Sequence, residues 1–178
     1  LLQIIHDNTH RLDRMVQDVL KLNRRDSATP ETFCMGEILR QFTERFCQTE
    51  KIPSRVVVLD VADDLMVRFD RHHFDQVLWN LCSNAWRYCQ RRDGSILLHA
   101  AFASPGNVVQ LDVADDGPGV AEALRTQLFE PFFTTDSTGT GLGLYIAREL
   151  CEANGATLDY IEAPQGGQFR ISSEGEMC

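Results

Sequence analysis

Residues 80–88 read Asn-Leu-Cys-Ser-Asn-Ala-Trp-Arg-Tyr and lie near the end of a predicted long helix. Asn80 and Asn84 are four positions apart, so their side chains share one helix face, and Arg87 follows on the same side. Two neutral amides beside a cation suit Mg²⁺ and the phosphates that it carries, because magnesium keeps several waters and takes few protein ligands. The alternative is a pair of solvated amides on a helix surface.

A second motif, Asp115-Asp116-Gly117-Pro118-Gly119, directly follows an apolar strand-like run. A carboxylate at a strand end can accept a hydrogen bond from an exocyclic amine such as that of adenine. Gly117 and Gly119 would let the backbone approach a flat base closely, because glycine has no side chain. Taken alone, the motif is more typical of a plain turn.

A third motif, Gly139-Thr140-Gly141-Leu142-Gly143-Leu144, opens a predicted helix. Glycines at a helix start expose backbone N–H groups, and the helix dipole favours an anion there. The spacing is G-x-G-x-G after a loop, whereas a Rossmann fingerprint needs G-x-G-x-x-G after a strand. A Walker motif is also excluded, because no Gly-Lys-Ser or Gly-Lys-Thr follows.

The segment Phe129-Glu130-Pro131-Phe132-Phe133-Thr134-Thr135 lies between these two motifs. Three phenylalanines in a Gly- and Thr-rich stretch indicate a loop that is pinned by hydrophobic anchors and can rest in more than one position. Ordinary core packing is the alternative interpretation.

The remaining pattern predicts a two-layer α/β sandwich, in which helices cover one face of a mixed sheet after an N-terminal helix. Asp70 is placed to cap the long helix that carries Asn80 and Asn84. The expected helices are 32–50, 71–90, a short one at 121–127, and 141–154. The expected strands are 55–61, 65–69, a hairpin of 95–103 and 107–114, and a second hairpin of 157–163 and 168–173.

Residues 1–25 show apolar positions at three- and four-residue spacing, which predicts a helix suited to pairing with a partner helix. An amphipathic helix packed on its own domain is the alternative. We expect residues 1–26 to belong to a dimerisation domain, 27–32 to be a linker and 33–178 to form the catalytic domain. The chain begins with Leu1, and we expect it to be part of a longer protein.

Composition excludes some partners. With 17 basic and 26 acidic residues the formal charge is −9, which argues against nucleic acid but not against a nucleotide. No apolar stretch approaches the roughly 20 residues needed to cross a bilayer, so we expect no membrane contact from this region. The six cysteines form no C-x-x-C pair, which favours reduced thiols and a cytoplasmic location.

The order and spacing of the four motifs resemble the N, G1, F and G2 boxes of the histidine-kinase branch of the GHKL ATPases. The resemblance covers about residues 33–173 and implies the Bergerat ATP-binding fold, with Mg-ATP or ADP bound under a mobile lid. It implies that Asn84 holds magnesium with help from Asn80, that Arg87 meets the phosphates, and that Asp115 binds the adenine amine. The other implied nucleotide-binding residues are Tyr88, Gly117, Gly119, Thr135, Gly139, Thr140, Gly141, Leu142 and Gly143.

Residues 139–154 look most like the type IV pilus sensor kinases of the PilS type. This resemblance implies transfer of the γ-phosphoryl group of ATP to a histidine on a dimerisation helix, and relay to an aspartate of a response regulator receiver domain. It also implies a homodimer of the full-length protein, whose other segments can anchor it in the inner membrane.

Two departures from the family pattern stand out. His6 and His10 are not followed by the residues of a phosphoacceptor box, so we expect the acceptor histidine to lie elsewhere and no autophosphorylation by this chain alone. Asp136 occupies a position where many relatives carry lysine. A carboxylate there would repel a triphosphate, so either it points away from the site or ATP binds weakly.

Three other functions stay open. ATPases of the gyrase, MutL or Hsp90 kind carry a glutamate general base where this chain has Asn80, and a neutral amide cannot accept a proton from water. A degenerate, non-catalytic binding or dimerisation module is supported by Asp136 and the acidic composition. An anti-sigma serine kinase of the same superfamily is disfavoured, because such proteins usually lack a preceding dimerisation helix.

Overall fold

The computed structural model of the chain describes residues 9, 12, 16, 28–62, 64–103, 107–136 and 139–177. Its centre is a seven-stranded sheet in the order β1-β3-β7-β5-β4-β2, with β6 paired to β7. The strands are β1 Glu31–Cys34, β2 Val57–Val61, β3 Leu65–Phe69, β4 Ile96–Ala103, β5 Val108–Asp115, β6 Thr157–Tyr160 and β7 Gln168–Met177. The sheet is mixed, because β2 runs parallel to β4 whereas the other pairs are antiparallel.

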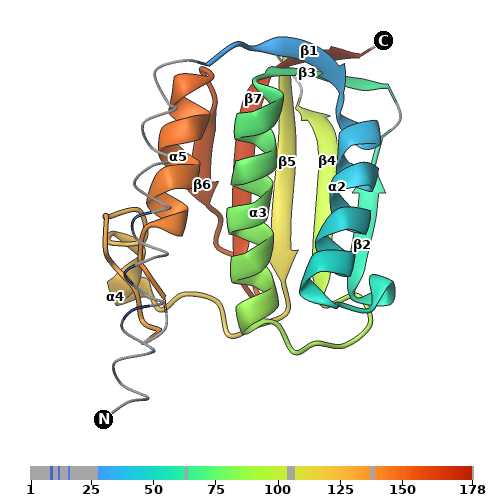
Figure 1. Cartoon of the computed structure of the whole chain (residues 1–178). Helices are drawn as coiled ribbons and strands as arrows, with labels where there is room; N and C mark the ends of the chain where they lie inside the picture. The colour runs from blue at the N-terminus through green and yellow to red at the C-terminus, as the bar shows by residue number, and fades with distance from the viewer. Residues whose placement is uncertain are drawn as a thin grey trace.

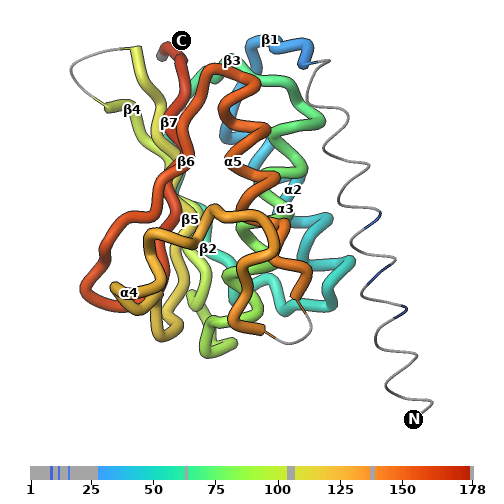
Figure 2. Tube along the Cα trace, turned by 90° about the vertical axis from the view of Figure 1, so that its left-hand side faces the viewer, coloured from blue at the N-terminus to red at the C-terminus, as the bar shows by residue number. Residues whose placement is uncertain are grey.

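Three helices cover one face of this sheet: α2 Met35–Glu50, α3 Arg71–Tyr88 and α5 Gly143–Ala153. Helix α3 lies between α5 and α2 in Figure 1, and the turned view in Figure 2 shows the helices on one side of the strands. A short helix, α4 Glu122–Arg125, and a 3₁₀ turn, η2 Ser54–Val56, complete the described elements. The predicted two-layer α/β sandwich is therefore confirmed. None of the described helices is both long and apolar enough to cross a membrane.

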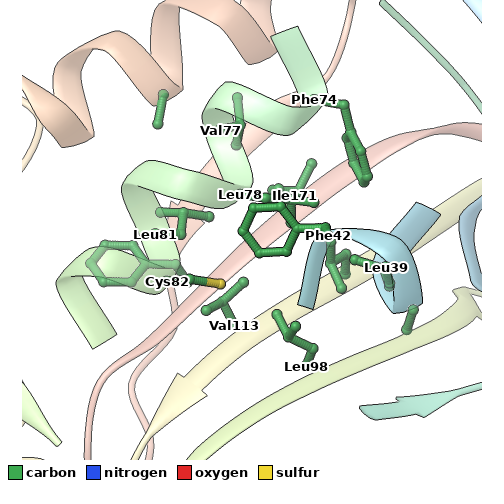
Figure 3. Packing of buried hydrophobic residues seen from close by; sticks show 14 of the residues in the cluster. Leu39, Phe42, Phe74, Val77, Leu78, Leu81, Cys82, Leu98, Val113 and Ile171 are labelled. Atoms are coloured by element: carbon green, nitrogen blue, oxygen red, sulfur yellow. The ribbon is translucent and has the colours of Figure 1, made fainter. Parts of the chain in front are cut away.

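The core fills the space between the two layers. Helix α3 contributes Phe74, Val77, Leu78 and Leu81, which occur at the three- and four-residue spacing of one helix face and are at most 1% exposed. They pack toward side chains from α2 and from the sheet, including Phe42, Leu98, Val113 and Ile171 (Figure 3). This packing fixes the rotation of α3 about its axis, and therefore fixes which side chains the helix presents on its other face. The five described cysteines are free thiols, and four of them are buried.

Asp70 caps the start of α3, as the sequence predicts. Its carboxylate accepts a hydrogen bond from the backbone N–H of His73 at 3.0 Å, and also from the backbone N–H and hydroxyl of Thr29 at 2.9 and 3.0 Å. Burial acts to raise the pKa of Asp70, but these hydrogen bonds outweigh it and hold the pKa below its usual value. The cap joins residues 28–30 to the helix that carries the candidate site.

Several expected elements differ from the structure at their ends, mostly by a few residues. Residues 32–34 are not helical but belong to β1, which pairs with β3, so α2 begins at Met35. Arg55 and Val56 lie in the 3₁₀ turn after Pro53, and the strand begins at Val57. In the expected helix 1–25, Thr9, Leu12 and Val16 are helical, while the other positions, including His6 and His10, lie outside the described residues.

Candidate nucleotide-binding site

A cavity of about 550 Å³ lies where α3, the end of β5 and the segment leading into α5 meet. Its volume is within the range of cavities that bind small molecules. Of the 13 residues predicted for the site, 11 line it: Asn80, Asn84, Arg87, Tyr88, Asp115, Gly119, Thr135, Gly139, Thr140, Gly141 and Gly143. Residues from four separate motifs, far apart in the chain, are thus brought to one cavity.

Two predicted residues do not line the cavity. Leu142 is 2% exposed and belongs to the hydrophobic core. Gly117 contributes indirectly, since its backbone N–H donates to Asp115 Oδ1 at 2.9 Å. A Cβ at Gly117 would lie 2.5 Å from the Tyr88 carbonyl oxygen, so the turn requires glycine there.

The α3 wall of the cavity carries Asn80, Ser83, Asn84, Arg87 and Tyr88. Asn80 faces the first residue of α5, because a Cβ built on Gly143 would lie 3.8 Å from Asn80 Oδ1. The Asn80 side-chain nitrogen is buried and has no hydrogen-bond partner among the described residues. A buried donor without a partner costs free energy, so this amide is suited to a ligand oxygen or a water.

Asp115 and its neighbour Asp116 have opposite environments. Burial raises the pKa of Asp115, against hydrogen bonds from the backbone N–H groups of Gly117 and Gly167. Burial acts to raise the pKa of Asp116 too, but hydrogen bonds from Gln90, Ser95 and Arg92 hold it below the usual value. Asp116 is thus engaged in joining the end of α3 to β4, whereas Asp115 faces the cavity.

Gly166 and Gly167 hold Asp115 in place, and the sequence did not reveal this role. The backbone N–H of Asp115 donates to the Gly167 carbonyl at 2.9 Å. At Gly166, where φ is +82°, a Cβ would lie 1.7 Å from the carbonyl oxygen of Asp115. No side chain fits at that approach. Two adjacent glycines before a predicted strand were the available signal, but their contact with Asp115 is non-local.

Next to Asp115 the cavity wall is mainly apolar and suits a flat base. Phe169 from β7 is 3% exposed and stacks edge-on against Phe129 and Tyr160. The other mainly apolar positions in the wall are Pro118, Val120, Ala121, Leu124, Leu128, Phe133 and Leu144. One carboxylate at the edge of an apolar slot is an arrangement that orients a base with an amino group.

The glycines before α5 permit a close approach of two loops. Gly141 has φ +72°, and a Cβ there would lie 2.4 Å from the carbonyl carbon of Phe132. Among the described residues, no side chain caps the first turn of α5. Its first N–H groups are therefore available to an anion.

The phenylalanine-rich segment is anchored at two of its three aromatic positions. Phe129 packs against the core and Phe133 lines the cavity, whereas Phe132 is 62% exposed and has φ +67°. The prediction of a loop pinned by three anchors is thus wrong for Phe132. Its backbone is instead set by the close contact with Gly141.

The described residues fit a nucleotide, and they fit magnesium held by amides. They contain no group of three or more His, Cys, Asp or Glu side chains that could hold a metal ion. Magnesium at this site would therefore take the Asn84 amide, phosphate oxygens and waters, which matches its preference for few protein ligands.

A comparison with protein families gives a match over residues 69–174 to the model described as histidine kinase-, DNA gyrase B- and HSP90-like ATPase. The chain belongs to this ATPase family. The matched region includes α3 and all the residues that line the cavity. The similarity of this chain to sensor kinases, described next, confirms the resemblance to the histidine-kinase branch.

Sensor protein kinase PilS of Pseudomonas aeruginosa is 41% identical over 175 residues, which are 97% of this chain and 33% of that protein. The chain thus spans about a third of that relative's length. The full-length structure of ShkA in complex with AMPPNP matches with TM-score 0.74 and 30% identity, over 94% of this chain and 36% of that one. ThkA in complex with the response regulator TrrA matches with TM-score 0.75 and 27% identity, over 96% of this chain and 49% of that one.

Proposed function

We propose that this ATPase domain is the catalytic part of a sensor histidine kinase. It binds Mg-ATP and transfers the γ-phosphoryl group to a histidine on a dimerisation helix. Similarity to sensor kinases and the fit of the cavity to a nucleotide support this proposal.

One observation favours phosphoryl transfer over hydrolysis. Among the described residues that line the cavity, Asp115 is the one carboxylate, and histidine is absent. Asp115 is held by Gly117 and Gly167 beside the apolar slot, where it serves the base. The position that would carry a general base for water is Asn80, whose neutral amide cannot accept a proton. The domain's contribution is then positioning and charge stabilisation, as in phosphoryl transfer generally.

Each residue then has a specific task. Asn84, with Asn80 beside it, would hold magnesium, which would supply positive charge beside the phosphates. Arg87 stabilises the charge on the phosphates, and Tyr88 lies along the nucleotide. Asp115 accepts from the adenine amine, and the turns at Gly117 and Gly119 shape the base slot. Thr135, Thr140 and the backbone of residues 139–143 surround the phosphates.

The same proposal specifies the partners. The acceptor histidine lies on a dimerisation helix of the same protein, the full-length protein is a homodimer, and a response regulator receiver domain takes the phosphoryl group. Residues 1–26 form the second helix of the dimerisation domain, 27–32 the linker and 33–178 the catalytic domain. The catalytic domain works in the cytoplasm and binds no nucleic acid.

A phosphotransfer assay tests the proposal. Incubation of this chain with labelled ATP should leave it unlabelled on histidine, and a separately supplied dimerisation domain with an acceptor histidine should become labelled. Arg87→Gln should greatly slow that labelling, because a phosphate-binding cation is lost. Asn107→Ala, in the β4–β5 hairpin outside the cavity, is a control and should leave the rate of labelling unchanged. Acid-labile phosphate on His6 or His10 would show that the acceptor has been misplaced.

The ion pair between Arg87 and Asp136 favours one alternative, a non-catalytic module, because it occupies the cation expected to bind phosphates. Titration calorimetry with Mg-ADP distinguishes the two functions. Measurable binding supports the kinase, whereas no binding of ADP or ATP supports the module.

A further inference from the structure

The cation expected to meet the phosphates already has a partner within the chain. Arg87 Nη1 lies 3.2 Å from Asp136 Oδ2, and the two side chains are 41% and 23% exposed. Arg87 lines the cavity, so its guanidinium is accessible to a ligand. A phosphate and the Asp136 carboxylate therefore compete for one guanidinium group.

Local hydrogen bonds fix the position of Asp136. Its backbone N–H donates to the Thr134 hydroxyl at 3.1 Å, and that hydroxyl lies 3.2 Å from the Asp136 carbonyl, to which it can donate. The Gly139 N–H donates to the same carbonyl at 3.1 Å. These hydrogen bonds hold the backbone of Asp136 where its carboxylate meets Arg87.

The packing around Gly139 supports the same conclusion. A Cβ built there would lie 3.3 Å from Arg87 Nη1 and 2.7 Å from the Thr134 hydroxyl. The turn and the guanidinium are therefore in close contact, and a phosphate that binds Arg87 must either displace the Asp136 carboxylate or lie close to its negative charge.

We propose that Asp136 is a specificity-determining residue that weakens nucleotide binding in proportion to phosphate charge. The inference rests on the proposed function. Release of Arg87 and repulsion from the carboxylate both act on phosphates, and Coulomb energy grows with charge. The loss of affinity is therefore largest for ATP, smaller for ADP and absent for adenosine. As a result, Asp136 lowers the ratio of ATP affinity to ADP affinity.

The test is titration calorimetry with AMPPNP, ADP and adenosine, the first two with magnesium. Asp136→Asn should tighten AMPPNP binding about three- to tenfold, tighten ADP binding less, and leave adenosine binding unchanged. Asp136→Ala should give the same order of ligands. The control is Glu130→Gln, which makes the same charge change at an exposed position of the same segment and should leave all three affinities unchanged.

A double variant tests whether Arg87 mediates the effect. In an Arg87→Gln background, Asp136→Asn should tighten AMPPNP binding about twofold or less, because no guanidinium remains to be released. Equal affinities of wild type and Asp136→Asn for AMPPNP and ADP, or an equal gain for adenosine, would overturn the inference while leaving the proposed function intact. Failure of the wild type and every variant to bind any of the three ligands would overturn both.

Discussion

The two ends of the cavity are built differently. At the base end, Asp115 is held by backbone contacts with Gly117, Gly166 and Gly167, at distances that leave no room for side chains. At the phosphate end, Arg87 is held by an ion pair with Asp136, and both side chains are partly exposed. Exposed ion pairs contribute about 0–1 kcal/mol, whereas backbone contacts of this closeness cannot be relaxed without moving the chain. The base end is therefore rigid, and the phosphate end is adjustable.

The sharpest way to break this comparison is to substitute one glycine. Gly166→Ala would bring a Cβ to within 1.7 Å of the Asp115 carbonyl oxygen. We expect loss of adenosine and nucleotide binding, and a fall in stability of more than about 2 kcal/mol. Calorimetry and denaturant unfolding measure the two effects.

Gly155→Ala is the matched control. Gly155 has φ +71°, close to that of Gly166, but no described atom lies within 4 Å of its Cβ position. Gly155→Ala should lower the free energy of unfolding by the backbone penalty alone, about 1–2 kcal/mol, and should leave adenosine affinity unchanged. If both substitutions behaved alike, the close approach at Asp115 would have no special importance.

The next largest effect concerns base selection. Asp115 should favour ADP over GDP, because guanine presents a carbonyl where adenine presents an amine, and two acceptors would then face each other. Asp115→Asn should remove most of a preference of about 1–3 kcal/mol, because an amide can donate to that carbonyl. Competition between ADP and GDP measures it, and equal wild-type affinities would contradict the role.

A smaller effect is expected from pH. Burial raises the pKa of Asp115, so the carboxylate takes up its proton at a higher pH than an ordinary aspartate, whose pKa is about 3.9. Adenosine affinity should therefore fall as the pH drops through this raised pKa, and Asp115→Asn should remove the dependence. Adenosine is the suitable ligand because it carries no titrating phosphate.

The contribution of Asp115 to folding has the opposite sign. Because its folded pKa is raised, the native state binds the proton more tightly, and this contribution to stability is lost as the pH rises through the folded pKa. For binding, an adenosine affinity that rose as the pH fell would contradict the proposal that Asp115 must be ionised to bind the base.

The smallest effect is expected at the phosphate end. The Tyr88 hydroxyl lies 3.4 Å from the Thr135 hydroxyl, and Tyr88 is 37% exposed. Tyr88→Phe should change ADP affinity by less than about 0.5 kcal/mol, because a long, exposed hydrogen bond contributes little. If Tyr88→Phe instead weakened ADP binding by about 1–3 kcal/mol, the size of the effect expected for Asp115→Asn, the phosphate end would not be adjustable.

Local signals predicted what depends on local structure. The Asp70 cap predicted α3, and the four-residue spacing of Asn80 and Asn84 predicted its polar face, which forms one wall of the cavity. Non-local contacts were not predictable in this way. Residues 32–34 join β1 because they pair with β3, and no side-chain cap among the described residues marks the start of α2 at Met35.

The same distinction holds within the site. The motifs predicted 11 of the cavity-lining residues because each motif occupies a short stretch of sequence. Gly166 and Gly167 were missed because they reach Asp115 from the start of the neighbouring strand β7, far away in the sequence. The side chain of Leu142 does not line the cavity, because it is buried in the core. The departure at Asp136 was visible in the sequence, but its partner Arg87 became apparent from the fold.

The assignment of magnesium and phosphates to α3 is tested most directly by the magnesium dependence of ADP binding in wild type and in Asn84→Ala, measured by calorimetry with adenosine as the reference ligand. We predict that magnesium tightens ADP binding to the wild type, that Asn84→Ala removes most of this gain, and that adenosine binds both proteins equally. A gain from magnesium that survived in Asn84→Ala would contradict the assignment of the metal and phosphates to this face of α3.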